Sequence, residues 1–144
     1  MLQKFFYSLY TTLIALFDKG KPQLVPLALY KQSIFNPVGL WTLVAALGLV
    51  LTFYYVFNGR ALSALLTLGW FRGRHWLLVL LLAAGLGAWL AYYISLQLGA
   101  AAEPYLRYFI IVNALVAATW YFLLSLLANL LVRHGQARAT PFRV

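Results

Sequence analysis

The run FNPVGLWTLVAALGLVLTFYYVFNGR, residues 35–60, contains no charged side chain before its last residue. From Pro37 onward it holds about 21 uncharged residues, which rise roughly 31 Å in an α-helix and match the roughly 30 Å hydrocarbon core of a bilayer. Of the 144 residues, 65% are hydrophobic and only 9% charged, and a soluble domain of this size could not cover so much apolar surface. Residues 36–57 are therefore predicted to form a transmembrane helix.

Two further stretches, residues 76–98 and 108–132, contain no Asp, Glu, Lys or Arg. A segment in lipid must satisfy its own backbone hydrogen bonds, as a helix or in a closed barrel, and these runs lack the alternation of barrel strands. We expect an all-α integral membrane helical bundle, a single membrane domain over residues 1–144. It has three transmembrane helices plus an N-terminal amphipathic or short fourth membrane helix.

The N-terminal segment, residues 1–17, is too short to be a clear span, because about 13 residues follow Lys4 without a charge. No cleavage pattern of small residues follows it, so we expect it to be retained. It is predicted to lie in the membrane surface. Four aromatic residues would then lie at the headgroup boundary: Phe5, Phe6, Tyr7 and Tyr10.

Proline, glycine and asparagine mark the connections. Asn36 with Pro37 predicts the start of the first span, and Asn58 with Gly59 its end. Residues 61–71 are apolar but too short to cross, so an interfacial or re-entrant position is expected. A short turn with Pro104 indicates an antiparallel hairpin of the second and third spans, and residues 133–144 form a polar tail.

Basic residues near the helix ends predict the orientation. With three spans, Lys19, Lys21, Lys31 and Arg107 share one side, and the other side holds Arg60, Arg72, Arg74, Arg133, Arg138 and Arg143. The arginine-rich side is expected to be cytoplasmic, which places the C-terminus inside, in a plasma or inner membrane. The net charge of +9 is scattered over loops and indicates anionic lipid headgroups rather than nucleic acid. The expected lipid contacts are Arg60, Arg72, Arg74 and Arg133.

Two stripes with a spacing of four residues follow the second and third spans. In the second span the stripe is Ala83, Gly87, Ala91 and Ser95, a small-residue pattern that lets another helix approach closely, in the same chain or another subunit. In the third span it is Asn113, Ala117, Tyr121, Ser125 and Asn129.

An amide in hydrocarbon needs a partner, so Asn113 is expected to face protein or water. Interhelical hydrogen bonds to Thr42, Thr52 or Gln97 are one interpretation. The other is a polar pore lining shared by several copies of the chain.

Residue types needed for catalysis are scarce. Asp18 and Glu103 are the only acids and both lie in loops, and there is no cysteine. This excludes paired carboxylates and thiol chemistry and disfavours coupled transport. The two histidines, His75 and His134, would lie near one membrane face, where interfacial side chains are the favoured interpretation over haem or pigment ligands.

The sequence thus favours a non-enzymatic integral membrane subunit, without metal or cofactor, that anchors or scaffolds a larger complex through its small-residue helix faces. Its partners would be the bilayer and other membrane subunits or copies of itself. A homo-oligomeric channel or membrane-permeabilising effector is the first alternative, and a pigment- or haem-binding subunit is the second.

Overall fold

The computed structural model of the protein describes residues 2–17, 30–57, 73–99 and 105–131. These residues form helices and no strand, which confirms the predicted all-α fold. The elements in chain order are α1 (Leu2–Phe17), the π-helical turn η1 (Tyr30–Ile34), α3 (Phe35–Leu51), the π-helical turn η2 (Thr52–Phe57), α5 (Gly73–Gln97) and α6 (Tyr105–Leu131).

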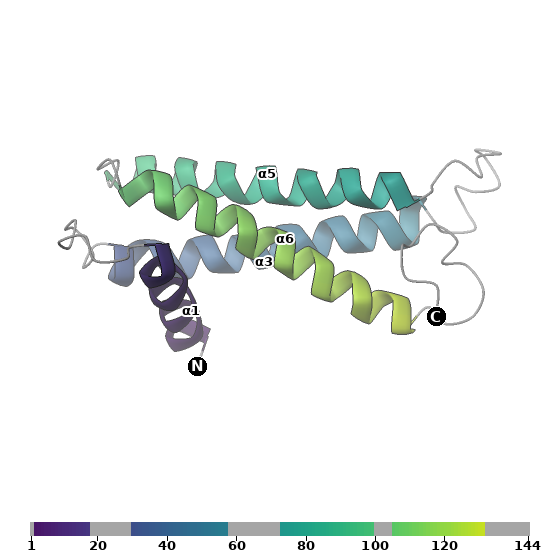
Figure 1. Cartoon of the computed structure of the whole chain (residues 1–144), viewed down its shortest axis with the longest axis horizontal. Coiled ribbons are helices and arrows are strands. Elements are labelled where there is room, and N and C mark those ends of the chain that lie inside the picture. Colours follow the sequence, from purple (N-terminus) through teal and green to yellow (C-terminus); the bar gives the residue numbers. More distant parts are fainter. Residues whose placement is uncertain (1, 18–29, 58–72, 100–104, 132–144) are drawn as a thin grey trace.

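Three long helices pack side by side, and α5 runs antiparallel to both α3 and α6 (Figure 1). Each contains a segment long and apolar enough to cross a membrane: Phe35–Tyr54, His75–Gln97 and Tyr105–Ala128. The protein is therefore a multi-pass membrane protein, as predicted. The shorter helix α1 lies across this bundle, near the end where α3 begins (Figure 1).

The helix boundaries differ from the predictions mainly at the N-terminal ends. Both α5 and α6 begin three residues earlier than expected and end within one residue of the expected place. At the far end of α5 the chain turns at Gly99, whose φ of 67° lies in the left-handed region that favours glycine. The Gly99 amide donates to the Leu96 carbonyl at 3.1 Å, which closes the last turn.

The first span begins at Phe35, within one residue of the predicted start at Asn36, but Asn36 does not cap the helix. Helical structure begins at Tyr30, runs through the wide turn η1 and continues into α3 without a side-chain cap. Tyr30 and Ile34 are both fully buried, so tertiary packing overrides the local start signal. Pro37 lies in the first turn of α3, directly after η1.

The surface position predicted for all four N-terminal aromatic residues is also wrong for two of them. Phe5 and Tyr7 are exposed, but Phe6 and Tyr10 are fully buried against the bundle. Phe6 lies where α1 crosses α3, because a Cβ at Gly39 would stand only 2.4 Å from the Phe6 ring. Helix α1 is therefore a packed part of the protein.

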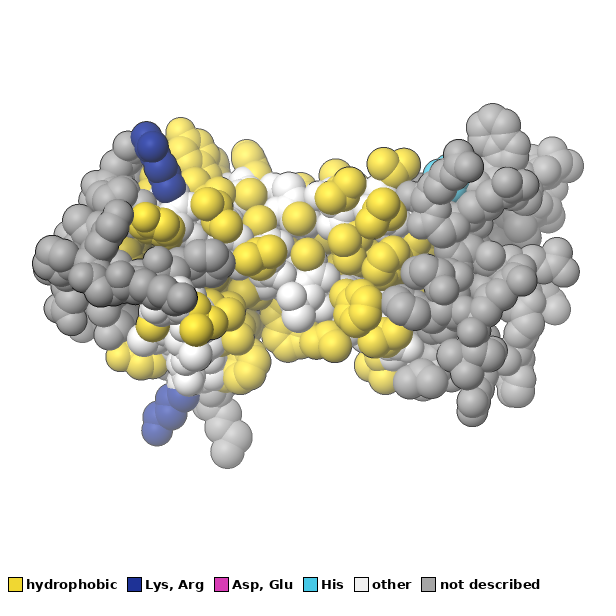
Figure 2. Space-filling model, viewed as in Figure 1, with side chains coloured by type: hydrophobic (Ala, Val, Ile, Leu, Met, Phe, Trp, Pro, Cys, Tyr) yellow, Lys and Arg dark blue, Asp and Glu magenta, His cyan; other side chains and the backbone are white. Residues whose placement is uncertain are grey.

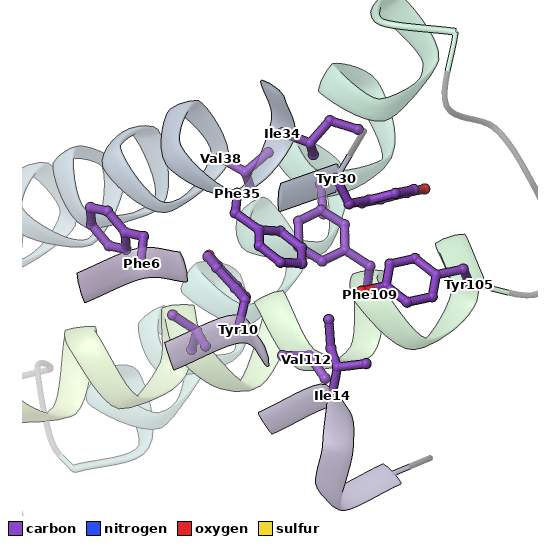
Figure 3. Close-up of a cluster of buried hydrophobic side chains, with 12 residues drawn as sticks. Phe6, Tyr10, Ile14, Tyr30, Ile34, Phe35, Val38, Tyr105, Phe109 and Val112 are labelled. Atoms are coloured by element: carbon purple, nitrogen blue, oxygen red, sulfur yellow. The ribbon is translucent and has the colours of Figure 1, made fainter. Parts of the chain in front are cut away.

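The core divides into two clusters along the bundle. The first is aromatic and lies under α1, where the rings of Tyr10, Phe35 and Phe109 contact one another at centroid distances of 5.1 to 5.5 Å (Figure 3). The second lies toward the other end and contains Val50, Phe53, Tyr54, Trp76 and Tyr121. Between them Gly87 of α5 lies directly against α6, at the polar site described below.

The outer surface between the ends of the bundle is apolar. In the face that Figure 2 shows, hydrophobic side chains cover the middle, and the basic side chains of the described residues lie near the end that α1 crosses. This distribution suits a bundle surrounded by lipid along its length.

Several predicted features lie outside the described residues. They are the segments 61–71 and 133–144, the stop signal Asn58-Gly59, and the residues Arg60, Arg72, Arg133 and His134, together with the side chains of Arg74 and Asn129.

Candidate functional site

Asn113 lies at the centre of a buried hydrogen-bond network. Its side chain is fully buried. The amide nitrogen donates to the Gly87 carbonyl at 2.7 Å and to the Thr42 hydroxyl at 3.0 Å. The amide oxygen accepts from the Tyr10 hydroxyl and, at 3.3 Å, from the Thr42 hydroxyl. Every polar atom of this side chain is thus used inside the protein.

These bonds join all four helices at one residue. Asn113 belongs to α6, and its partners Tyr10, Thr42 and Gly87 belong to α1, α3 and α5. Inside a membrane no water competes for such groups, so a polar side chain that loses its partner there is costly. We call Asn113, Tyr10, Thr42 and Gly87 the four-helix junction.

Tyr10 stays a hydrogen-bond donor in this site. Burial raises the pKa of its phenol above the usual range, and the hydrogen bond with Thr42 lowers it by less. A higher pKa means that the hydroxyl keeps its proton at any physiological pH. The link between α1 and Asn113 is therefore insensitive to pH.

Gly87 brings α5 and α6 together beside the junction. A Cβ at this position would stand 2.5 Å from the Ala117 Cβ and 2.9 Å from the Asn113 carbonyl oxygen. No real side chain fits there, so the carbonyl of Gly87 reaches Asn113 only because the residue is glycine. The close approach and the hydrogen bond depend on each other.

The two predicted stripes lie inside the chain and the junction connects them. All four residues of the α5 stripe, Ala83, Gly87, Ala91 and Ser95, are buried. The α6 stripe is buried from Asn113 through Ala117 and Tyr121 to Ser125. The polar stripe thus faces the protein interior, and in this arrangement it is not open to a pore between copies of the chain.

Toward the other end of the bundle, the α6 stripe lies beside η2. The hydroxyls of Tyr121 and Tyr54 lie close to Ser125, and all three side chains are almost fully buried. In the described part of the chain, none of these three hydroxyls makes a hydrogen bond. The tightly bonded polar site is therefore the one at Asn113.

Of the three partners expected for Asn113, the structure brings Thr42 to it. Thr52 is exposed and donates to the Gly48 carbonyl of its own helix at 2.8 Å. Gln97 is exposed at the end of α5. His75 is partly exposed at the start of α5, and the described residues contain no cluster of three or more metal-ligating side chains.

Sequence reasoning missed the part that Tyr10 plays in the site and the part that Gly39 plays where α1 crosses α3. The signal for Tyr10 is the spacing of Phe6, Tyr10 and Ile14, which places three bulky residues on one face of α1. Such a face can pack on protein as well as on lipid. Gly39 carries no such signal, since its role depends on the side chain that crosses it.

A Tyr10→Phe substitution is expected to loosen α1 and leave the three long helices intact. It removes one donor to Asn113 and costs about 1 to 2 kcal/mol. In hydrogen–deuterium exchange, the α1 amides should exchange faster while those of α5 do not. Thr12→Val also removes a hydroxyl from α1, at an exposed position, and should leave exchange unaltered. Equal exchange in both variants would show that apolar packing alone holds α1.

The junction contains amides, hydroxyls and a carbonyl, all paired with one another, and so its chemistry is suited to fixing helices in place. Comparisons with protein-family models, with curated proteins and with solved structures found no match to this chain.

Proposed function

We propose that the chain is a non-enzymatic integral membrane subunit that anchors a larger membrane complex. The observation that carries this proposal is the outer face of α5, which keeps an exposed glycine among large apolar side chains. The α5 and α6 stripes make their contacts inside the bundle. A partner subunit would therefore bind a surface other than the small-residue stripe that the sequence predicts.

The outer face of α5 has the spacing of a helix-packing seam. Six of its exposed positions alternate at intervals of four and three residues, the repeat by which one helix packs along another. They are Leu78, Leu82, Gly85, Trp89, Tyr92 and Leu96.

Gly85 is the central feature of this seam. It is exposed, and no atom of the described residues lies within 4 Å of the place where its Cβ would stand. Two residues later, Gly87 serves the contact with α6. In membrane helices small residues allow a second helix to approach closely. We infer that Gly85 serves a transmembrane helix of another subunit.

The chemistry of the described residues supports binding rather than catalysis. None of them is Asp or Glu, and the exposed basic side chains are Lys4 and Arg107. General acid–base and nucleophilic catalysis need titratable groups held together in a site. The junction around Asn113 offers none, so we assign it the role of holding the anchor rigid.

Native mass spectrometry of the complex extracted from its own membrane would test this proposal with Gly85→Leu and Gly48→Leu. Gly48 is a matched control, because it is also exposed and has open space at its Cβ, but it lies on α3. We expect a distinct subunit in fixed ratio with the unaltered chain and with Gly48→Leu, and its loss with Gly85→Leu. A ring of identical chains, or a partner that both variants retain, would contradict the proposal.

A further inference from the structure

An apolar groove runs between α1 and α6. It encloses about 270 Å³. The one hydroxyl in its lining, that of Thr119, already donates its proton to the Leu115 carbonyl of its own helix at 2.8 Å. The other main lining residues are Phe5, Leu9, Leu13, Val116, Trp120 and Leu123.

The groove lies at the depth of hydrocarbon. Its wall on α6, residues 115–123, occupies the middle of the membrane span Tyr105–Ala128. A gap left beside apolar side chains would forfeit their dispersion contacts, so an occupant that follows the groove is favoured. The material around the protein at this depth is the acyl chains of lipids.

Helix α1 presents three different sectors to its surroundings. The first faces the core, the second lines the groove and the third is exposed and polar. Because each set is shifted by one residue from the next, the groove sector lies between the other two. The core sector is Phe6, Tyr10 and Ile14; the groove sector is Phe5, Leu9 and Leu13; and the polar sector is Lys4, Ser8 and Thr12.

The polar sector places a positive charge beside the groove. Lys4 is exposed and directly precedes Phe5, a lining residue. The long apolar stem of a lysine can lie along hydrocarbon and let the ammonium reach toward the headgroups. The groove thus combines an apolar wall with a cation at its border.

We propose that this groove binds an anionic phospholipid, with one acyl chain between α1 and α6 and the phosphate at Lys4. Charge complementarity selects an anionic headgroup, and the apolar lining selects the chain. This site is separate from the arginine-rich face for which the sequence predicts lipid contacts, and it does not depend on the proposed anchoring role.

The test is native mass spectrometry of the full chain released from nanodiscs that contain equal amounts of phosphatidylglycerol and phosphatidylcholine. We expect the unaltered protein to retain phosphatidylglycerol in preference. Thr119→Trp fills the groove and should abolish retention. Leu81→Trp adds the same ring to an exposed position of α5 and should leave retention unchanged.

Lys4→Gln tests the headgroup contact. It should weaken the preference for phosphatidylglycerol about five-fold, the effect of one Lys near an anionic surface. Arg107→Gln removes a different exposed charge and should have a smaller effect. Retention of phosphatidylglycerol by the Thr119→Trp protein would overturn the site. Loss of a bound protein, rather than of a lipid, from this variant would also overturn it. Equal retention of both lipids, or equal effects of the two charge changes, would overturn the assignment of the phosphate to Lys4.

Discussion

Replacement of Asn113 by Leu should destabilise the bundle by about 3 kcal/mol, because it leaves several buried polar groups without a partner. Leu is close to Asn in size, so the change removes hydrogen bonds without opening a large cavity. The Tyr10 hydroxyl and the Gly87 carbonyl lose the bonds that Asn113 provides. Unfolding in mixed micelles of dodecylmaltoside and SDS, followed by circular dichroism, would measure the loss.

Thr119→Ala is the matched control for this experiment. Thr119 lies on the same helix as Asn113, but it is exposed and bonds only its own backbone. Its replacement should change the free energy of unfolding by less than about 0.5 kcal/mol. A similar small effect of Asn113→Leu would contradict the junction. Combining Asn113→Leu with Tyr10→Phe should cost less than the sum of both, since they remove one shared bond.

Replacement of Gly87 by Val is expected to have an effect at least as large, about 3 kcal/mol or more, by overpacking the contact of α5 with α6. Even the first carbon of the side chain would stand 2.5 Å from the Ala117 Cβ. The helices must separate, and the Gly87 carbonyl then withdraws from Asn113. Thermal unfolding monitored by size-exclusion chromatography would report the loss of the folded protein.

Gly85→Val is the control for overpacking, because a Cβ at Gly85 meets open space. Its stability as an isolated chain should stay close to that of the unaltered protein. Ala117→Gly should restore part of the stability that Gly87→Val loses, since it removes one of the two contacts. A Gly87→Val protein as stable as Gly85→Val would show that α5 and α6 are not in close contact there.

The three spans could be predicted from sequence because one physical constraint governs them. Hydrocarbon requires long uncharged helices, and the runs around Trp41, Trp89 and Trp120 meet this requirement without help from other parts of the chain. The extension of this helix back to Tyr30, through η1, could not be predicted in this way. Tyr30 joins the helix because its ring packs on Tyr105 and Phe109, which follow much later in the chain.

The site was predictable in part, for a similar reason. The side-chain amide of Asn113 indicates that a hydrogen-bond partner exists, because any amide within a membrane span needs one, whatever the rest of the chain does. The identity of the partners depends on how the helices are rotated and staggered. Tyr10 is 103 positions away from Asn113, and no pattern within α1 indicates which helix its buried face meets.

The two ends of the bundle differ. Helix α1 crosses the bundle at one end, and α6 runs toward the other end (Figure 1). Consecutive spans that run in opposite directions leave the start of α3 and the end of α6 at opposite ends of the bundle (Figure 1). A partner at the start of α3 and a partner at the end of α6 would be tethered at a separation set by the length of the bundle. The four-helix junction keeps that tether stiff, because a displacement of any one helix must break hydrogen bonds that all four share.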